Sequence, residues 1–562
     1  KEGLFFFEKK NQKTFIRSAR ALAAAAGRWH DAGMIDPVTV AVLQNRLNAI
    51  AEEMGEAMLR TSYSQILNSS RDFSIGLIDA QARLVAQADH IPVHVGALPW
   101  AVRALMEAFP SPAPDDVYLL NDPYFGGSHL PDLTAFVPVF AGGGLAFWSV
   151  VRAHQSDIGG ATMGGYNPGA TEIWQEGLRI PPILLTERGV VREDLVRMLA
   201  ANVRLPQDFR GDLAAMVGAA RLGQKRLDAA AAEFGAATLL AAVEAMLDGA
   251  EHHARAVVAS WQDGTYTGAA VLDDDGHGIE NVTVHATVTV AGSDLTVDLT
   301  ESDPQVIGFI NSSHANMQSA VAMAFAFLLD PDCARNAGAF RPLRVIAREG
   351  TVVWAREGAP VTMCTSHCSD EIVEAIIVAL SAACPDRVMG GWGRRFRVAI
   401  EGRDGRDGRR FIWHMFHARP GGGASIAGDG WHNSGEWHTA GGLKFGSIEV
   451  AEARFPLVFE SHEFNLGSGG AGRHRGGDGG AMWLRIDTAG PATANTAGDG
   501  VRHGARGMLG GGDGAVHRYT LHAPDGTARV LKTKEVGIAV APGSRLHVLA
   551  GGGGGWGAEG GA

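Results

Sequence analysis

The spacing of apolar and polar positions predicts a regular succession of helices and strands at the start of the chain. Asp36 is a good N-cap and Pro37 stands at the first helical position, so a long helix is predicted from there to about Met58. Apolar residues alternate in 73–87 around the turn sequence DAQA, which is typical of a β-hairpin. The segment 96–109 has helical spacing and is predicted to form a second helix.

A second hairpin is predicted where two apolar runs flank three glycines, in GGSHLPDLTAFVPVFAGGGLAFWSVVRAHQSD, residues 126–157. Strands at about 133–140 and 145–152 are expected to pair antiparallel across the glycine turn. Asp132 then lies opposite roughly residue 153, within a slip of one or two residues. The predicted pairing therefore brings the two ends of this segment together.

Four side chains of ligand type gather at the open end of this predicted hairpin: His129, Asp132, His154 and Asp157. Imidazole and carboxylate ligands suit Zn²⁺, Mn²⁺ or Fe²⁺, and no thiol is needed. Asp72 in SSRDFS and His94 in HIPVHVGALP are candidates for a further ligand. A single strand-end histidine more often caps backbone groups, but four ligand-type residues gathered by one hairpin favour a metal site.

The pattern changes twice after this hairpin. Residues 206–262 are rich in alanine and nearly free of proline, which predicts two or three long helices. The segment 265–301 alternates with period two, which is typical of an antiparallel meander. Two apolar helices are predicted in SHANMQSAVAMAFAFLL and SDEIVEAIIVALSAAC, and short strands with dense glycine follow after about residue 390. The chain is therefore predicted to be an α+β protein of several subdomains.

Four regions follow from these changes of pattern. A mixed α/β part with the metal-site hairpin comes first, long helices lie in the middle, and the C-terminal region is rich in strands and glycine. The expected bounds are 1–33 for an N-terminal extension that is disordered or not native, 34–262 for a metal-bearing α+β domain with long helices, 263–390 for the β meander plus helices, and 391–562 for a glycine-rich β domain.

Composition excludes several classes of function. The 562 residues are 46% hydrophobic and 20% charged and include 75 glycines, which indicates a globular protein with many tight turns. The net charge is −12 and no extended Lys/Arg cluster occurs, so nucleic-acid binding is disfavoured. No apolar run reaches membrane-spanning length, so no membrane association is expected. Four sparse cysteines favour a reduced, cytoplasmic protein.

Three further groups of residues carry less weight. Cys364 and Cys368 flank a histidine as in a metal site, but they more simply pack beside a helix start. The segment 468–480 is either an anion-binding nest or a structural turn. Glu449 and Glu452 are expected in a strand, where a spacing of three puts them on opposite faces and disfavours a catalytic pair. The sequence contains neither a P-loop nor a strand–GxGxxG–helix unit.

The order of several motifs, from about Ile35 to the C-terminus, resembles that of the hydantoinase B/oxoprolinase family. The motifs are SRDFS (70–74), IPVHVGALP (91–99), NDPYFGGSHLPDLT (121–134), RAHQSDIGG (152–160), RGDLAAMVGAARLG (210–223) and SGGAGRHRGGDG (468–479). Two features depart from the family. Gln155 stands where relatives often have a second histidine, and CTSHCSD (364–370) is not a family motif, which leaves the substrate open.

The resemblance implies a B-type subunit that works in a hetero-oligomer with a hydantoinase A-type partner. That partner carries an actin-like ATPase domain, so ATP is expected on the partner. Members of the family open cyclic amides such as hydantoins, 5-oxoproline and lactams at the expense of ATP, and a related branch carboxylates ketones. In relatives a divalent metal is bound by residues that correspond here to Asp72, His129, Asp132 and His154.

The function predicted from these observations is that of an ATP-dependent amidohydrolase subunit acting on a small cyclic amide. The metal is expected to activate water, and Asp157 is expected to orient His154 or the water, or to act as general base. One alternative is a subunit of a ketone carboxylase like acetone carboxylase, although such subunits are longer. The other is a non-catalytic scaffold for the ATPase subunit.

Overall fold

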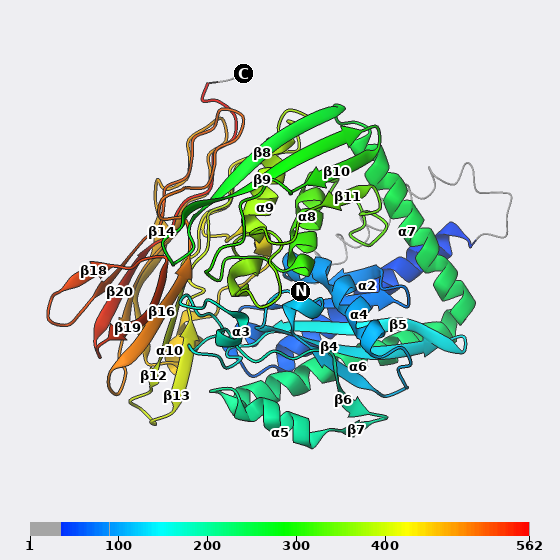
Figure 1. Ribbon diagram of the computed structural model, residues 1–562, viewed down its shortest axis with the longest axis horizontal. Coiled ribbons are helices and arrows are strands. Elements are labelled where there is room, and N and C mark those ends of the chain that lie inside the picture. Colours follow the sequence, from blue (N-terminus) through cyan, green and yellow to red (C-terminus); the bar gives the residue numbers. More distant parts are fainter. Residues whose placement is uncertain (1–34, 89, 561–562) are drawn as a thin grey trace, which may run out of the picture.

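A seven-stranded antiparallel sheet underlies the N-terminal part of the chain, drawn in blue and cyan in Figure 1. The computed structural model describes residues 35–88 and 90–560, so the predicted extension 1–33 lies outside the described residues. The strands of this first sheet, in spatial order, are β2 (Leu84–Ala88), β1 (Phe73–Asp79), β5 (Gly144–His154), β4 (Asp132–Ala141), β3 (Val117–Leu120), β6 (Ile183–Glu187) and β7 (Val190–Val191).

Helices cover both faces of the first sheet. Strand residues such as Val137 belong to a core shared with α2 (Pro37–Thr61) and α6 (Pro206–Phe234). Strand residues of the opposite face, such as Trp148, pack with α4 (Pro92–Ala108). Because successive strand residues point to opposite faces, a sheet buried on both sides is apolar along nearly its whole length.

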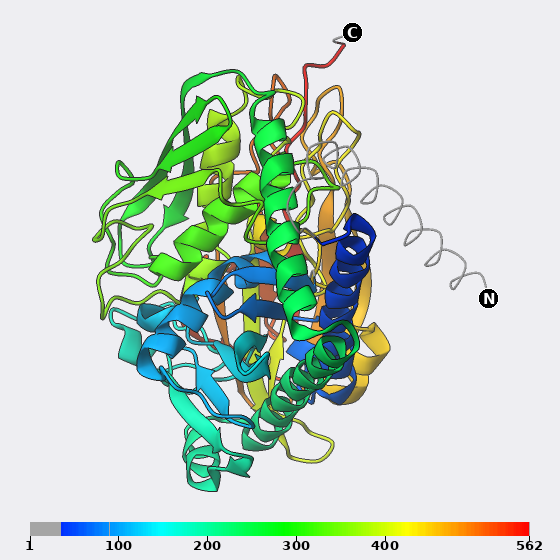
Figure 2. The ribbon, with the colours of Figure 1, turned by 90° about the vertical axis from the view of Figure 1, so that its right-hand side faces the viewer.

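The helices predicted in this part are confirmed. The carboxylate of Asp36 accepts hydrogen bonds from the amides of Val38 and Thr39 at 3.3 and 2.9 Å and so caps α2. After the short α5 (Glu193–Ala201), the alanine-rich segment forms α6 and α7 (Ala236–Val258), which are bent by 106° relative to each other. Figure 2 shows α7 standing across the molecule near α2.

The β4–β5 hairpin is present, but its register differs by one residue from the prediction. Asp132 pairs with His154 rather than with residue 153. The physical reason is a β-bulge between Val139 and Phe140, which adds one residue to β5 and shifts every pair between the bulge and the open end. Asp132 and His154 consequently stand directly opposite each other at the open end.

A second sheet contains the predicted meander. Its strands, in spatial order, are β11 (Leu343–Ile346), β10 (Asp294–Asp298), β9 (Glu280–Ala291) and β8 (Gly264–Asp274). The consecutive strands β8 to β10 are antiparallel as expected, whereas β11 joins β10 in parallel. The two predicted apolar helices form α8 (His314–Leu328) and α9 (Ser369–Ala379): α9 packs on β8 and β9, and α8 lies between α9 and α4.

Two more sheets form the glycine-rich C-terminal part, drawn in yellow to red in Figure 1. One contains β13 (Arg410–His414), β12 (Phe396–Arg403), β16 (Ala492–Gly498) and β19 (Lys534–Val540). The other contains β14 (Leu457–Asn465), β15 (Gly479–Ile486), β20 (Ser544–Leu549), β17 (Arg518–His522) and β18 (Ala528–Val530). A separate hydrophobic core that includes Trp413, Leu484 and Val548 joins the two sheets.

The strand predicted around Glu449 and Glu452 is wrong, because these residues lie on the helix α10 (Ile448–Arg454). Ser447 caps this helix, and residues three apart on a helix share a side. The two carboxylates nevertheless have separate partners: Glu449 accepts from the hydroxyl of Ser447, and Glu452 accepts from the amide of Phe459. They form no carboxylate pair.

Glycine segments of the C-terminal part pack backbone against backbone, in a unit that we call the glycine bundle (residues 421–423, 476–477 and 551–555). The amide of Gly553 donates to the carbonyl of Gly477, and the amide of Gly477 to that of Gly422, both at 2.9 Å. A Cβ added at Gly553 would stand 2.0 Å from the carbonyl oxygen of Gly422. The close approach of these chains therefore requires glycine.

Two general expectations can be compared with the described residues. Within 35–88 and 90–560, no single helix is long and apolar enough to cross a membrane, and only the bent pair α6–α7 reaches that length and composition together. All four cysteines are buried and none forms a disulfide. The domain boundaries at 262/263 and 390/391 stay predictions.

Candidate metal centre

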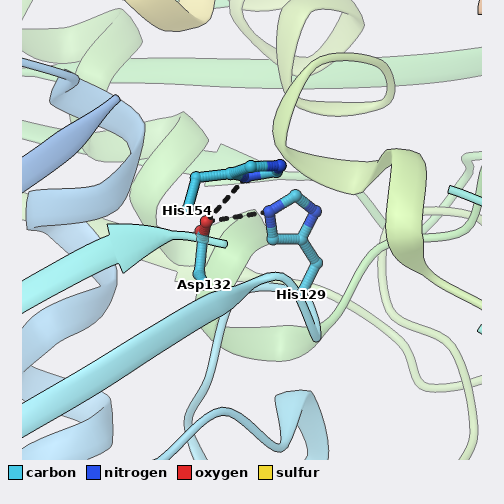
Figure 3. Close-up of side chains that lie close together, drawn as sticks. All are labelled: His129, Asp132 and His154. Carbon is cyan, nitrogen blue, oxygen red and sulfur yellow. Dashed lines mark hydrogen bonds and ion pairs between the residues drawn. The ribbon is translucent and has the colours of Figure 1, made fainter. Parts of the chain in front are cut away.

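Three side chains meet at the open end of the β4–β5 hairpin (Figure 3). His129 Nε2 lies 2.9 Å from Asp132 Oδ1, and His154 Nδ1 lies 3.2 Å from the same oxygen. One potential ligand atom from each residue lies within 4.8 Å of the other two, and all three residues are buried. No other group of His, Cys, Asp and Glu among the described residues has this spacing. These three residues form the candidate metal centre.

The fold positions each of the three residues through a different element. Asp132 is the first residue of β4, His154 is the last residue of β5, and the ladder pairs them. His129 lies in the loop between the short helix η2 (Pro123–Phe125) and β4, where its carbonyl accepts a hydrogen bond from the amide of Asp132 at 3.1 Å. The hairpin register and one short turn therefore determine the geometry of the cluster.

The imidazole of His129 is oriented by a backbone carbonyl. Its Nδ1–H donates to the carbonyl oxygen of Thr362 at 2.6 Å, so in the neutral ring the lone pair lies on Nε2. Nε2 is buried and has no hydrogen-bond partner of acceptable geometry, although Asp132 Oδ1 is only 2.9 Å away. A bare nitrogen and a carboxylate oxygen repel each other unless a cation lies beside them. An orphaned ring nitrogen held in this tautomer fits a metal ligand.

Asp132 is fully buried and is held ionised by its neighbours. Burial works to raise its pKa, but the imidazoles of His129 and His94 outweigh burial and hold the pKa of Asp132 well below its ordinary value. Ser128 Oγ donates to Oδ2 at 2.5 Å, and His94 Nε2 lies 3.3 Å from the same oxygen. Burial opposes a charge on His129, yet Asp132 raises the pKa of His129. The cluster thus contains a buried anion that a cation can balance.

Asp72 lies beside the cluster, behind His94. Its Oδ1 is 3.8 Å from His94 Nε2, and both residues line the same small cavity as His154. Burial lowers the pKa of His94 to about 4, against the opposing effect of Asp132 and Asp72. The structure therefore brings three of the four predicted ligands into contact and places Asp72 on the adjoining cavity wall. Ligation of a metal by all four stays a prediction.

Asp157 is engaged elsewhere. Its buried carboxylate accepts hydrogen bonds from the amides of Gly159 and Gly164 at 3.3 Å, and from the amide and Nη1 of Arg204 at 2.7 and 3.0 Å. Burial raises the pKa of Asp157, although the Arg204 contacts oppose the shift. These contacts hold the loop that follows β5 and favour a structural role. The general-base role of Asp157 stays a prediction.

The cavity beside His154, here called the central cavity, has a second wall that was not predicted from the sequence. This wall comes from the C-terminal part of the chain and contributes four cationic or basic side chains: Arg395, Arg397, His414 and His438. The arginines are two apart in GRRFRV, a spacing that places both on one side of an extended chain. This spacing of two can be read from the sequence, but only the packing of β12 near the first sheet reveals which side of the strand faces the cavity.

His438, in the short helix η5 (Trp437–Thr439), is oriented by a buried carboxylate. Its Nδ1 lies 3.1 Å from both oxygens of Asp370, and its backbone amide donates to Oδ1 at 2.8 Å. Burial raises the pKa of Asp370, and the imidazole of His438 opposes that shift. The other ring nitrogen faces away from Asp370. An imidazole held in this way on a cavity wall has the arrangement of a proton carrier.

The two weaker candidates from the sequence are occupied by internal contacts. Cys368 directly precedes α9, and Cys364 Sγ contacts the carbonyl of Ser128 at 3.3 Å, as expected for packed residues at a helix start. In the glycine-rich segment, three successive amides already donate to acceptors of the protein. These donor–acceptor pairs are Arg473 to Gly557, His474 to Trp556, and Arg475 to the Asp429 side chain. The segment is thus a structural turn.

The chain belongs to the hydantoinase B/oxoprolinase family, whose model matches residues 36–559. The β subunit of caprolactamase from Pseudomonas jessenii is 36% identical over 449 residues, which are 79% of this chain and 77% of that subunit. The inferred B-type subunit of a D-/L-hydantoinase from Pseudomonas sp. (strain NS671) is 28% identical over 548 residues, which are 94% of this chain and 91% of that protein. The predicted family is confirmed.

Solved structures support the fold. The crystal structure of ATP-dependent caprolactamase from Pseudomonas jessenii superimposes with a TM-score of 0.87 at 33% identity and covers 93% of this chain and 91% of that chain. The nucleotide-free structure of acetone carboxylase superimposes with a TM-score of 0.85 at 19% identity, over 98% of this chain and 79% of that chain. At that identity the likeness to acetone carboxylase shows the shared fold alone. The α+β class is confirmed.

Proposed function

We propose that this chain is the metal-bearing subunit of an ATP-dependent amidohydrolase that opens a cyclic amide in the cytoplasm. The observation that carries the proposal is the buried cluster of His129, Asp132 and His154, with the orphaned Nε2 of His129. Membership of the hydantoinase B/oxoprolinase family supports it. Among hydantoins, 5-oxoproline and lactams, the 36% identity to a caprolactamase subunit favours a lactam.

His129, Asp132 and His154 would hold the divalent ion, Zn²⁺, Mn²⁺ or Fe²⁺, with Asp72 as a further ligand. The ion would supply Lewis acidity, which makes water nucleophilic near neutral pH. Asp132 would balance its charge, and the carbonyl of Thr362 favours the His129 tautomer that can ligate. Burial of the cluster strengthens these electrostatic interactions by excluding bulk water.

The chain works with a hydantoinase A-type ATPase partner, which fits the lack of a nucleotide motif in this sequence. On the partner, the amide oxygen takes the γ-phosphoryl group of ATP and ADP leaves. On this chain, water adds to the activated carbon, the ring C–N bond breaks, and the ring nitrogen takes a proton. A second water releases phosphate. Overall, one lactam, one ATP and two waters give the amino acid, ADP and phosphate.

His438 is the residue that we expect to carry protons in this reaction, because Asp370 holds its Nδ1 and the ring borders the central cavity. Proton transfer by a positioned imidazole contributes roughly 10²–10⁴-fold to a rate. After water has added, the ring nitrogen is a poor leaving group until it is protonated. The proposed task of the His438 imidazole is therefore to protonate this nitrogen.

The test is ATP-dependent opening of caprolactam by the purified complex of this chain with its ATPase partner. We expect wild-type turnover without bicarbonate, and His129→Ala should abolish ring opening while the partner's basal ATPase activity remains. His285→Ala, which removes an exposed histidine of β9, is the matched control. Full turnover of His129→Ala contradicts the proposal, and turnover that depends on bicarbonate favours a ketone carboxylase instead.

A further inference from the structure

Two buried arginines on the second wall of the central cavity have unpartnered N–H groups. Arg397 is 2% exposed and its Nη1 has no hydrogen-bond partner, while Arg395 is 8% exposed and its Nε has none. Both line the cavity that Asp72 and His154 line from the first sheet. Guanidinium groups present planar donors that suit oxyanions. The positions of these two side chains therefore indicate a ligand that accepts hydrogen bonds.

Arg397 is held in place without a carboxylate. Its Nη2 donates to the carbonyl of Gly164 at 2.6 Å and to His414 Nδ1 at 2.8 Å, and its guanidinium lies 4.2 Å from the centre of the Tyr166 ring. His414 Nε2–H in turn donates to the carbonyl of Ser156 at 3.1 Å. Within the described part of the chain, no Asp or Glu forms an ion pair with Arg397. Neutral groups alone thus hold a buried cation that lines the cavity.

Arg395 has one carboxylate nearby, unlike Arg397, but that carboxylate is already engaged by another arginine. Its Nη1 is 3.9 Å from Glu436, but Glu436 already accepts a hydrogen bond from Arg419 at 2.8 Å. Buried charges in proteins are normally paired, because an uncompensated charge loses its hydration without gaining a partner. Burial lowers the pKa of Arg397 to about 9, in line with that cost. A net positive wall of this kind is stabilised when an anion enters the cavity.

We propose that Arg395 and Arg397 form a phosphoryl subsite that holds the phosphoryl group of the activated amide across the central cavity from His154 of the candidate metal centre. This inference rests on the proposed function, in which ATP is used on the partner and the product of that step reaches this chain. A phosphoryl group offers three oxygens and about two negative charges, enough to accept from both arginines. The carboxylate of the opened ring is the competing anion of lower charge.

Inorganic phosphate is the probe, titrated calorimetrically into the full chain after metal removal so that binding to a metal ion cannot contribute. Wild type is expected to bind phosphate saturably and acetate at least about tenfold more weakly, because acetate carries less charge. Arg397→Met and Arg395→Met should each weaken phosphate binding by at least about tenfold, the equivalent of one charge-assisted hydrogen bond. Arg410→Met, which removes an exposed arginine of β13, should bind phosphate like wild type.

Circular dichroism of each variant establishes that it is folded. The two variants test the subsite independently, because Arg397 donates hydrogen bonds to Gly164 and His414 and Arg395 does not. Wild-type affinity in both folded variants overturns the subsite. Acetate binding as tight as phosphate overturns the phosphoryl assignment in favour of a carboxylate. Phosphate binding needs neither the partner nor turnover. A complex that fails to open lactams while this chain binds phosphate therefore refutes the lactam assignment and leaves the phosphate site of Arg395 and Arg397 standing.

Discussion

Asp132 and His154 are direct partners across the β4–β5 hairpin, and the Nδ1 of His154 lies 3.2 Å from the Oδ1 of Asp132. The bulge between Val139 and Phe140 makes them partners, since a register changed by one residue turns a side chain to the other face of a sheet. The candidate metal centre is therefore a consequence of strand register as much as of residue type.

Glu176 connects the metal centre to a second segment of the chain. Its buried carboxylate accepts hydrogen bonds from the amides of Val361 and Thr362, both at 2.9 Å, and the carbonyl of Thr362 orients His129. Burial raises the pKa of Glu176 from 4.5 to about 7. A raised pKa in the folded state means that stability is present below about pH 4.5 and is lost as the pH rises to about 7.

The variant Glu176→Gln does not titrate, so it should escape this loss. Between about pH 5 and about pH 8, the unfolding free energy of wild type is expected to fall relative to that of the variant by up to about 3 kcal/mol. Thermal unfolding of the two metal-free proteins across this pH range measures the difference. A difference that does not change with pH would show that Glu176 keeps an ordinary pKa.

His438→Gln should slow ring opening by about 100-fold or more, because it removes the imidazole that Asp370 orients. The exchange leaves His129, Asp132 and His154 untouched, so metal content should match wild type. Steady-state kinetics of the complex give kcat, and His285→Gln serves as the exposed control. An unchanged kcat in His438→Gln would exclude proton transfer by this residue.

Asp157→Asn separates the two roles open to Asp157. The hydrogen bonds to Arg204 and to the loop amides favour a structural role, so the variant should lose about 2–4 kcal/mol of stability, as when a buried ion pair loses one partner. Its kcat at a temperature where it is folded should then fall by less than about tenfold. A variant of wild-type stability with abolished turnover would instead support the general-base role.

Gly553→Ala should destabilise the C-terminal part by roughly 1–3 kcal/mol or more, because the added methyl group would stand 2.0 Å from the carbonyl oxygen of Gly422. Gly490→Ala is the matched control, since a Cβ there meets nothing within 4 Å. Thermal unfolding of both variants compares them. Equal melting temperatures would mean that the glycine bundle tolerates side chains.

Local patterns allowed much of the fold to be predicted, and tertiary contacts explain what was missed. The cap at Asp36 and the period-two alternation of the hairpins are local signals, and both elements are present. The bulge at Val139 leaves the apolar pattern intact and so cannot be predicted from it. For this reason the observed register differs by one residue from the predicted register. Glu449 lies on a helix because Glu and Ala, which favour helix, predominate in IEVAEAR.

The second wall of the central cavity was beyond local prediction for a physical reason. Arg397 and His438 follow His154 by more than two hundred residues in the sequence, and only the packing of separate sheets brings them to one cavity. A buried arginine without a carboxylate is recognised by its contacts, which no sequence pattern contains. In contrast, His129, Asp132 and His154 were predictable because one hairpin gathers them.

The most direct test of the metal centre is elemental analysis combined with anomalous X-ray diffraction, applied to wild type and to Asp132→Asn after incubation with Zn²⁺, Mn²⁺ or Fe²⁺. Wild type should contain a single divalent ion per chain, located between His129, Asp132 and His154. Asp132→Asn should remain folded and lack the ion. A wild-type protein that takes up none of these metals, or an ion bound away from these three residues, would contradict the account.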